Sequence, residues 1–344
     1  MSTVDAPAER PRAGATGVAG PDRTRVIRLV VGYAAVVAVL PYLTLKALWV
    51  SGTMVGVPEG SPARGPGFVG PNIVTALLDV VAIAVALALT HRWGRRWPAW
   101  LVLAPIWVGT GLLIPAACQV ANGVAAAAIT GGRAVSLAGG LVEPWTYVVV
   151  YTSFGLQGLL LTTAFALYAR ARWADLLDPA GSVAGPGPTR GVQVVLAAAG
   201  AVAAGAVAAA HLVMAFGTQG AVTGADQPGW EYTARSGEVV NAAMAALAVA
   251  GIRVMIRRPD AGRRTPVWVA VALTWTGSGA MFAYALLSLA AVVTGAPESD
   301  NLTALNGLTQ LAALLGGLLI AVTALVNLAE RRPPAVDPDE QDTP

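Results

Sequence analysis

The sequence predicts an all-α integral membrane protein made of eight transmembrane helices, arranged as two tandem, parallel four-helix repeats. Three observations lead to this class. Hydrophobic residues make up 56% of the 344 residues and charged residues only 12%, about half the charged share of a typical soluble domain. Several apolar runs exceed the roughly 20 residues that a helix needs to cross a bilayer. One of these runs, 98–111, recurs at 266–279.

The recurrence keeps five residue types in register at a constant offset of 168 positions. The pairs are Pro98 with Pro266, Trp100 with Trp268, Trp107 with Trp275, Gly109 with Gly277, and Gly111 with Gly279. Weaker matches extend the similarity outward, so the chain is interpreted as a duplication. Each half has four apolar runs, an even number, and both halves are therefore expected to have the same orientation in the membrane.

Eight apolar runs define the predicted spans. They cover about 26–50, 69–90, 98–118, 145–168, 191–215, 237–256, 266–294 and 306–328. The first repeat is placed at 26–177 and the second at 191–330. A Pro/Gly-rich linker at 178–190 separates them, and tails at 1–25 and 331–344 are expected to be disordered. The Ala-rich segment 119–144 is kept extracytoplasmic, as a short helix or a re-entrant piece.

The arginines predict the orientation. When the segments outside the spans are taken alternately from the N-terminal tail, one set holds 18 of the 21 arginines, and the other holds only Arg64, Arg133 and Arg235. Positively charged loops remain in the cytoplasm. Both termini are therefore expected to be cytoplasmic, in a multi-pass protein of the plasma membrane. The first run is long and no signal-peptidase pattern follows it, which favours a span over a cleaved signal peptide.

Several functional classes lack support in the sequence. A single cysteine, Cys118, allows neither an intrachain disulfide nor a CxxC zinc motif. His91 and His211 fall at opposite ends of their predicted helices, so they are not expected to ligate one haem or metal. No nucleotide-binding glycine loop, HExxH or GxSxG motif occurs, and the arginines do not form a nucleic-acid-binding face. We therefore expect no enzyme, no cofactor, no metal site and no nucleic-acid partner.

Polar residues inside the spans are the candidates for a polar path. Asn72, Thr75 and Asp79 lie at i, i+3 and i+7, on one face of the second predicted helix. The corresponding face in the second half carries Glu238 and Asn241. An ionisable side chain inside a membrane is costly and is treated by default as a functional candidate. The alternative is a structural hydrogen bond or ion pair that holds the helices together.

Lys46 is the only lysine, and at an offset of 165 its counterpart is His211. Counted from the predicted helix ends, Lys46 lies about 9 Å deep and Asp79 about 12 Å deep, at roughly 1.5 Å per residue. Consecutive antiparallel helices are usually neighbours. The sequence therefore predicts a Lys46–Asp79 ion pair. A snorkelling lysine and a hydrogen-bonded core histidine are the alternative interpretations of Lys46 and His211.

Two tryptophans, Trp107 and Trp275, are predicted near mid-membrane, where an indole N–H needs a partner. Each is followed by small residues, Gly109 and Gly111 in the first half and Gly277 and Gly279 in the second. Small residues let membrane helices approach closely. These six residues are expected either to line a mid-membrane cavity or to form a tightly packed helix contact, and packing is favoured.

In its composition, with abundant Ala, Gly, Val and Arg, the chain resembles uncharacterised multi-pass membrane proteins of actinobacteria. The resemblance includes no diagnostic motif and implies no activity. The function expected from the residues is that of a permease-like or transporter-like protein for a small solute or ion. The alternative is a non-catalytic membrane scaffold that binds a partner protein or lipid. The lipid bilayer is the expected environment, and the sequence predicts no oligomeric state.

Overall fold

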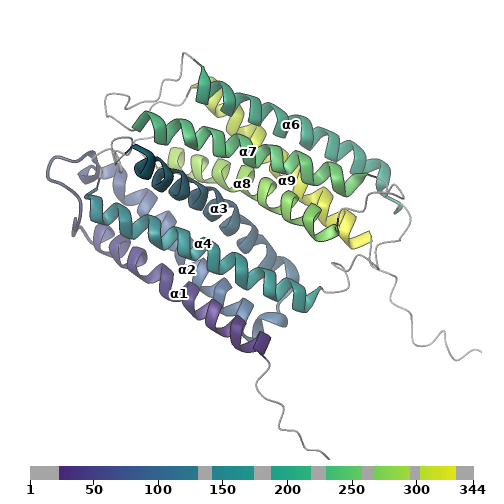
Figure 1. Ribbon diagram of the computed structural model, residues 1–344, viewed down its shortest axis with the longest axis horizontal. Helices are drawn as coiled ribbons and strands as arrows, with labels where there is room; N and C mark the ends of the chain where they lie inside the picture. Colours follow the sequence, from purple (N-terminus) through teal and green to yellow (C-terminus); the bar gives the residue numbers. More distant parts are fainter. Residues whose placement is uncertain are drawn as a thin grey trace, which may run out of the picture.

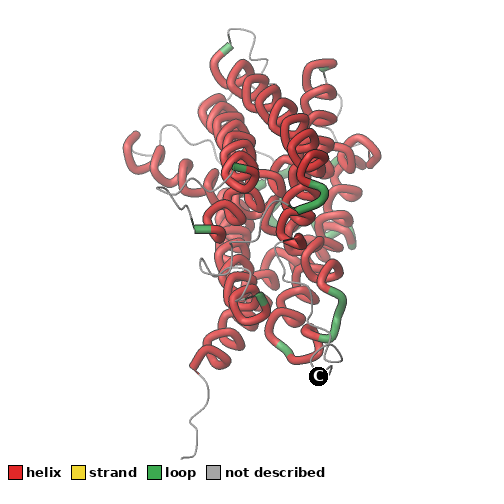
Figure 2. Tube along the Cα trace, turned by 90° about the vertical axis from the view of Figure 1, so that its right-hand side faces the viewer, coloured by secondary structure: helices red, strands yellow, loops and turns green. Residues whose placement is uncertain are grey.

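A computed structural model describes residues 23–130, 142–173, 187–217, 230–257, 266–294 and 303–330. Within these ranges the regular structure is entirely helical (Figures 1 and 2). The long helices, labelled as in Figure 1, are α1 (Arg23–Val50), α2 (Val69–Thr90), α3 (Ala99–Thr130), α4 (Pro144–Arg172), α6 (Arg190–Phe216), α7 (Trp230–Ile256), α8 (Val267–Thr294) and α9 (Ala304–Glu330). Three short 3₁₀ helices lie in the loops that flank α2.

All eight long helices of the described chain are long and apolar enough to cross a membrane. Large apolar side chains face outward along them, including Val202 and Val293. Such faces suit a lipid environment and are unfavourable in water. The prediction of an all-helical, multi-pass membrane protein is therefore confirmed at this level.

The predicted spans agree closely with the helices, and α2 begins and ends where the sequence predicts. Most helices extend a few residues beyond the predicted spans, and two extend much further. The third helix continues through the Ala-rich segment to Thr130, because alanine is the best helix former and no proline or glycine pair interrupts the run before that point. The sixth long helix, α7, begins at Trp230 rather than near residue 237. The predicted tails, except 23–25, and most of the linker (178–186) lie outside the described residues.

The helices form two groups of four (Figure 1). In the first group α1 packs against α2 and α4, and α3 packs against α4; in the second, α6 packs against α7 and α9, and α8 packs against α7 and α9. The principal contact between the groups is α3 against α8, and Figure 1 shows these two helices between the remaining members of each group. Helices α1, α3, α6 and α8 begin, and α2, α4, α7 and α9 end, at the same end of the bundle (Figure 1).

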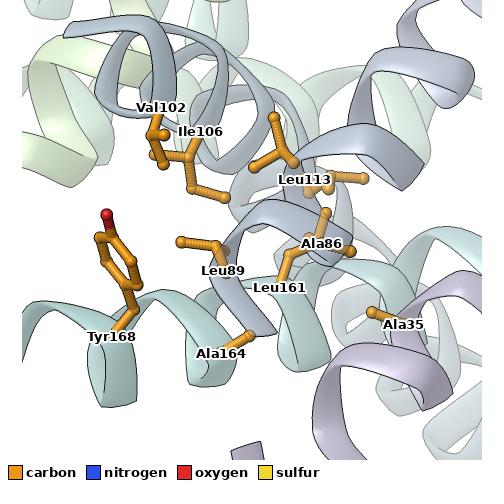
Figure 3. Close-up of a cluster of buried hydrophobic side chains, with 10 residues drawn as sticks. Ala35, Ala86, Leu89, Val102, Ile106, Leu113, Leu161, Ala164 and Tyr168 are labelled. Atoms are coloured by element: carbon orange, nitrogen blue, oxygen red, sulfur yellow. The ribbon is translucent and has the colours of Figure 1, made fainter. Parts of the chain in front are cut away.

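Each group has a hydrophobic core of its own. The first core, drawn in Figure 3, takes side chains from all four helices, including Ala35 of α1, Leu89 of α2, Ile106 of α3 and Leu161 of α4. The second core is assembled in the same way from α6, α7, α8 and α9. Its members are smaller: six of its ten buried residues are alanine, compared with three of ten in the first core. Because small side chains bring helix axes together, the second group is held by close helix contact.

A network of polar side chains links the start of α6 to the end of α9 in the second group. The Glu330 carboxylate accepts hydrogen bonds from the Thr189 hydroxyl at 2.5 Å and from the Gln193 amide at 2.7 Å. The Asn327 amide donates to the Gln193 carbonyl oxygen at 2.9 Å. A carboxylate at the start of a helix is also favourable for the helix dipole, so this network joins the first and last helices of the group.

Candidate functional site

The predicted ion pair between α1 and α2 is present. Lys46 Nζ lies 2.7 Å from Asp79 Oδ2, and the lysine is completely buried. The ammonium group also lies 3.8 Å from the centre of the Tyr42 ring, within the range of a cation–π contact. The Gln157 amide of α4 is a further hydrogen-bonding partner of the Asp79 carboxylate. Every charged atom therefore has a partner, which is the condition under which a buried ion pair is tolerated.

The other two members of the predicted helix face bond to the backbone at the start of α2, and Thr75 is also a hydrogen-bonding partner of Tyr42 on α1. The Asn72 amide donates to the Phe68 carbonyl at 2.8 Å, and the Thr75 hydroxyl donates to the Pro71 carbonyl at 2.9 Å. Such bonds satisfy a polar side chain locally. Asp79 is thus the member of this face that forms an ion pair with another helix.

Four half-buried tyrosines extend this polar cluster toward the second group. Tyr147 and Tyr151 of α4 stack with ring centres 4.1 Å apart, and their hydroxyls form a hydrogen-bonding pair. Tyr151 is an electrostatic neighbour both of Tyr42, beside the ion pair, and of Tyr284 on α8. The Tyr284 hydroxyl donates to the Leu112 carbonyl of α3 at 3.3 Å. The sequence analysis did not identify these tyrosines, because they come from three separate helices, α1, α4 and α8, and only the tertiary structure brings them together.

The second group holds a different charged contact. His211 Nδ1 of α6 lies 2.5 Å from Glu238 Oε2 of α7. The histidine is buried, whereas 29% of the Glu238 side chain remains exposed. Asn241 lies one turn further along α7 and is half-buried. Both groups therefore join their first two helices through a side chain that is, or can become, cationic and a carboxylate, but Glu238 occupies the position that corresponds to Asn72 rather than to Asp79.

The two mid-helix tryptophans lie in the contact between α3 and α8. Trp107 Nε1 donates to the Ser278 hydroxyl at 3.2 Å, and Trp275 Nε1 donates to the Thr110 hydroxyl at 3.0 Å. At the repeat offset Trp107 corresponds to Trp275 and Thr110 to Ser278, so the two bonds are reciprocal. Both indole N–H groups have the partner that burial requires.

The four glycines beside these tryptophans have unequal surroundings. A methyl group at Gly111 would lie 2.3 Å from the Gly279 carbonyl oxygen, so the α3 and α8 backbones touch there. A methyl group at Gly277 would instead meet the backbone of α7, 2.2 Å from the Ala248 nitrogen. Gly109 has nothing within 4 Å of such a group. The contact at Gly111 and Gly279 is tight packing.

The candidate residues therefore gather in three places. Lys46 and Asp79 join α1 to α2, His211 and Glu238 join α6 to α7, and the tryptophans join α3 to α8. Two cavities of the described structure lie elsewhere, one between α2 and α3 and one between α6 and α7. Neither is lined by His211 or Glu238, so this pair gives no basis for proposing a hydrolytic or redox site. Within the described ranges, no three His, Cys, Asp or Glu side chains are arranged to hold a metal ion.

Fold and polar clusters together define a helical, multi-pass membrane protein with a buried ion pair in its first helix group and a partly exposed His–Glu contact in its second. No family model matches the chain, and neither a curated protein nor a solved structure matches it significantly.

Proposed function

We propose that the two helix groups are parallel repeats, with both termini in the cytoplasm of a plasma-membrane protein. The matching sequence stretches support this, as do the equivalent packing of α1–α2 and α6–α7, of α1–α4 and α6–α9, and of α3–α4 and α8–α9. The reciprocal tryptophan bonds are the pattern expected around a twofold axis along the membrane normal. The distribution of 18 arginines against 3 supports the orientation.

On this arrangement we propose a permease-like or transporter-like function for a small solute or ion. The observation that carries the proposal is that each group has its own core and its own interhelical carboxylate contact, while the groups meet mainly through α3 and α8. Two internally linked bodies joined along one helix pair are suited to rocking, the motion by which repeat-based transporters expose a site alternately. Asp79, Lys46 and the tyrosines that reach α8 form the proposed polar path.

A non-catalytic scaffold that binds a protein partner or lipid is the second candidate. The specific observation in its favour is the backbone contact at Gly111 and Gly279, which leaves no room for a side chain at that point between α3 and α8. If α3 and α8 stay permanently packed, the bundle would act as a rigid support that presents its outward helix faces to a protein partner or lipid. In this function the ion pair would only stabilise the first group.

A proton-flux assay separates the two candidates. Purified protein is reconstituted in vesicles that contain a pH-sensitive dye, and a potassium diffusion potential drives proton entry. The proposed path predicts that wild-type protein conducts protons faster than protein-free vesicles and that Asp79→Asn, confirmed to be folded by size-exclusion chromatography, loses this flux. Arg170→Gln, on the exposed surface at the end of α4, is the control and should retain it. Wild-type flux equal to that of empty vesicles would contradict a proton path and favour the scaffold.

A further inference from the structure

A groove of about 460 Å³ runs between α6 and α7 at the arginine-rich end of the bundle. Its α6 wall is made of small side chains, Ala197, Ala198 and Ala201, and its α7 wall includes Val249 and Ile252. The lining runs from residue 194 to residue 202 and from residue 249 to residue 257, or roughly 12 Å in each segment at about 1.5 Å per residue. Because both helices are long enough to cross a membrane, the groove would run alongside lipid chains.

Two arginines distinguish this groove from an ordinary lipid-facing surface. Arg253 and Arg257 line the groove where it reaches the arginine-rich end of the bundle, and both are exposed. They are four residues apart: Arg253 lies in the last turn of α7, and Arg257 directly follows the helix and donates its backbone N–H to the Arg253 carbonyl at 3.1 Å. A third, Arg190, lies at the same end and donates to the Ile256 carbonyl at 2.7 Å. The groove lining contains no acidic residue.

No described carboxylate neutralises this group of arginines. The ion pairs in the described ranges are those of Asp79 and Glu238, and Glu330 at the same end of the bundle is bonded to Thr189 and Gln193. The second cavity offers an internal comparison: about 360 Å³ between α2 and α3, it is lined by apolar residues and contains no charged side chain. Apolar lipid chains alone would cover that groove, whereas the α6–α7 groove also presents two arginines that pair with no carboxylate of the described residues.

We propose that the α6–α7 groove binds an anionic phospholipid. An acyl chain lies along the alanines of α6, and the phosphate lies between the guanidinium groups of Arg253 and Arg257, which suit phosphate because of their paired N–H donors. Basic pockets at the ends of membrane helices are suited to anionic headgroups. The proposal requires only that the helices lie in a bilayer, and it is independent of any transport function.

Native mass spectrometry of the delipidated protein, titrated with phosphatidylglycerol, tests the site. Each arginine near an anionic headgroup contributes roughly a fivefold factor, so the double variant Arg253→Gln/Arg257→Gln should bind about 30-fold more weakly. Arg170→Gln removes an exposed arginine of α4 at the same end of the bundle. Its affinity for phosphatidylglycerol should stay within about twofold of wild type. Phosphatidylcholine with the same chains should bind wild type as weakly as phosphatidylglycerol binds the double variant.

Two further arms identify the ligand. Ala201→Phe, which fills the groove but leaves both arginines, should also weaken binding of phosphatidylglycerol. The soluble headgroup glycerophosphoglycerol, which has no acyl chains, should fail to displace the lipid. Unchanged affinity in the arginine double variant, equal binding of phosphatidylcholine by wild type, or full displacement by the soluble headgroup would each overturn the proposal. Matching thermal unfolding of the lipid-free variants confirms that a loss of binding is not a loss of fold.

Discussion

Lys46→Met is expected to lower the free energy of unfolding by about 3–5 kcal/mol, the usual cost of removing one partner of a buried ion pair. Asp79→Asn should lower it by a similar amount. The reason is geometric: the two charged atoms are 2.7 Å apart, and Lys46 is fully buried, so neither charge can reach water once the other is removed. The double change Lys46→Met/Asp79→Asn should cost less than the sum of the single changes.

Detergent-titrated unfolding in mixed micelles, followed by circular dichroism, measures all four proteins of this cycle. Thr44→Ala is the control: its exposed hydroxyl bonds only to the Leu40 carbonyl of its own helix, and its removal should change stability by less than about 0.5 kcal/mol. Strict additivity of the two single changes would mean that the observed contact contributes nothing to stability. Asp79 would then act as an isolated acid.

Gly111→Ala is expected to be the second large effect, a loss of about 1–3 kcal/mol from overpacking. The added methyl would lie 2.3 Å from the Gly279 carbonyl oxygen and 2.4 Å from its carbon. These are backbone atoms, so no side-chain rotation can relieve the overlap, and α3 and α8 must separate. Separation would also lengthen the two tryptophan hydrogen bonds, each worth about 0.5–1.5 kcal/mol.

Gly109→Ala provides a matched comparison from the same motif. A methyl group there has nothing within 4 Å, and alanine favours a helix by up to about 1 kcal/mol over glycine. This variant should therefore be neutral or slightly more stable than wild type. The same unfolding assay, with tryptophan fluorescence as a second signal, compares the two. Equal stabilities of the two variants would show that the α3–α8 contact does not hold the halves together.

Much of the fold could be predicted because long apolar runs in the sequence directly indicate transmembrane helices. The α2 boundaries follow from a predominantly apolar run between a proline-rich loop and an arginine-rich one. The Lys46–Asp79 contact also followed from the sequence, since both depths could be counted from well-defined helix ends and consecutive helices pack together.

The His211–Glu238 contact was not predicted, and the reason is a helix boundary. With the helix expected to begin near residue 237, Glu238 stood at its edge, about one turn nearer the helix end than His211. The helix begins at Trp230 instead, which places Glu238 eight residues inside it, or about 12 Å. The seven residues before 237 are polar and were read as a loop, but only the tertiary structure shows that helix α7 continues through them.

The reciprocal bonds between α3 and α8 were beyond sequence reasoning for another reason. The repeat identified Trp107 and Trp275 as equivalent, and their need for a hydrogen-bond acceptor was evident. The acceptor for each, however, comes from the opposite half, and a duplication alone does not show which helices of the two halves meet. The unequal surroundings of Gly109 and Gly277 likewise arise from neighbouring helices that a local motif does not describe.

The central proposal, two rigid helix groups that rock about the α3–α8 seam, is tested most directly by distances between spin labels in lipid nanodiscs. On a Cys118→Ser background, one pair of labels is placed at Val50 of α1 and Leu305 of α9, at the end of the bundle opposite the arginine-rich end. The other joins Arg170 of α4 to Val192 of α6 at the arginine-rich end. All four positions are exposed, so labelling should leave the packing intact.

Electron–electron resonance at about pH 5 and about pH 8, between which histidine normally changes charge, gives the two distance distributions. Rocking predicts two distance populations for each label pair. Any shift that lengthens the Val50–Leu305 distance must shorten the Arg170–Val192 distance. A single narrow distance at both ends, unchanged between the two conditions, would contradict the proposal and identify the seam as a fixed part of a scaffold.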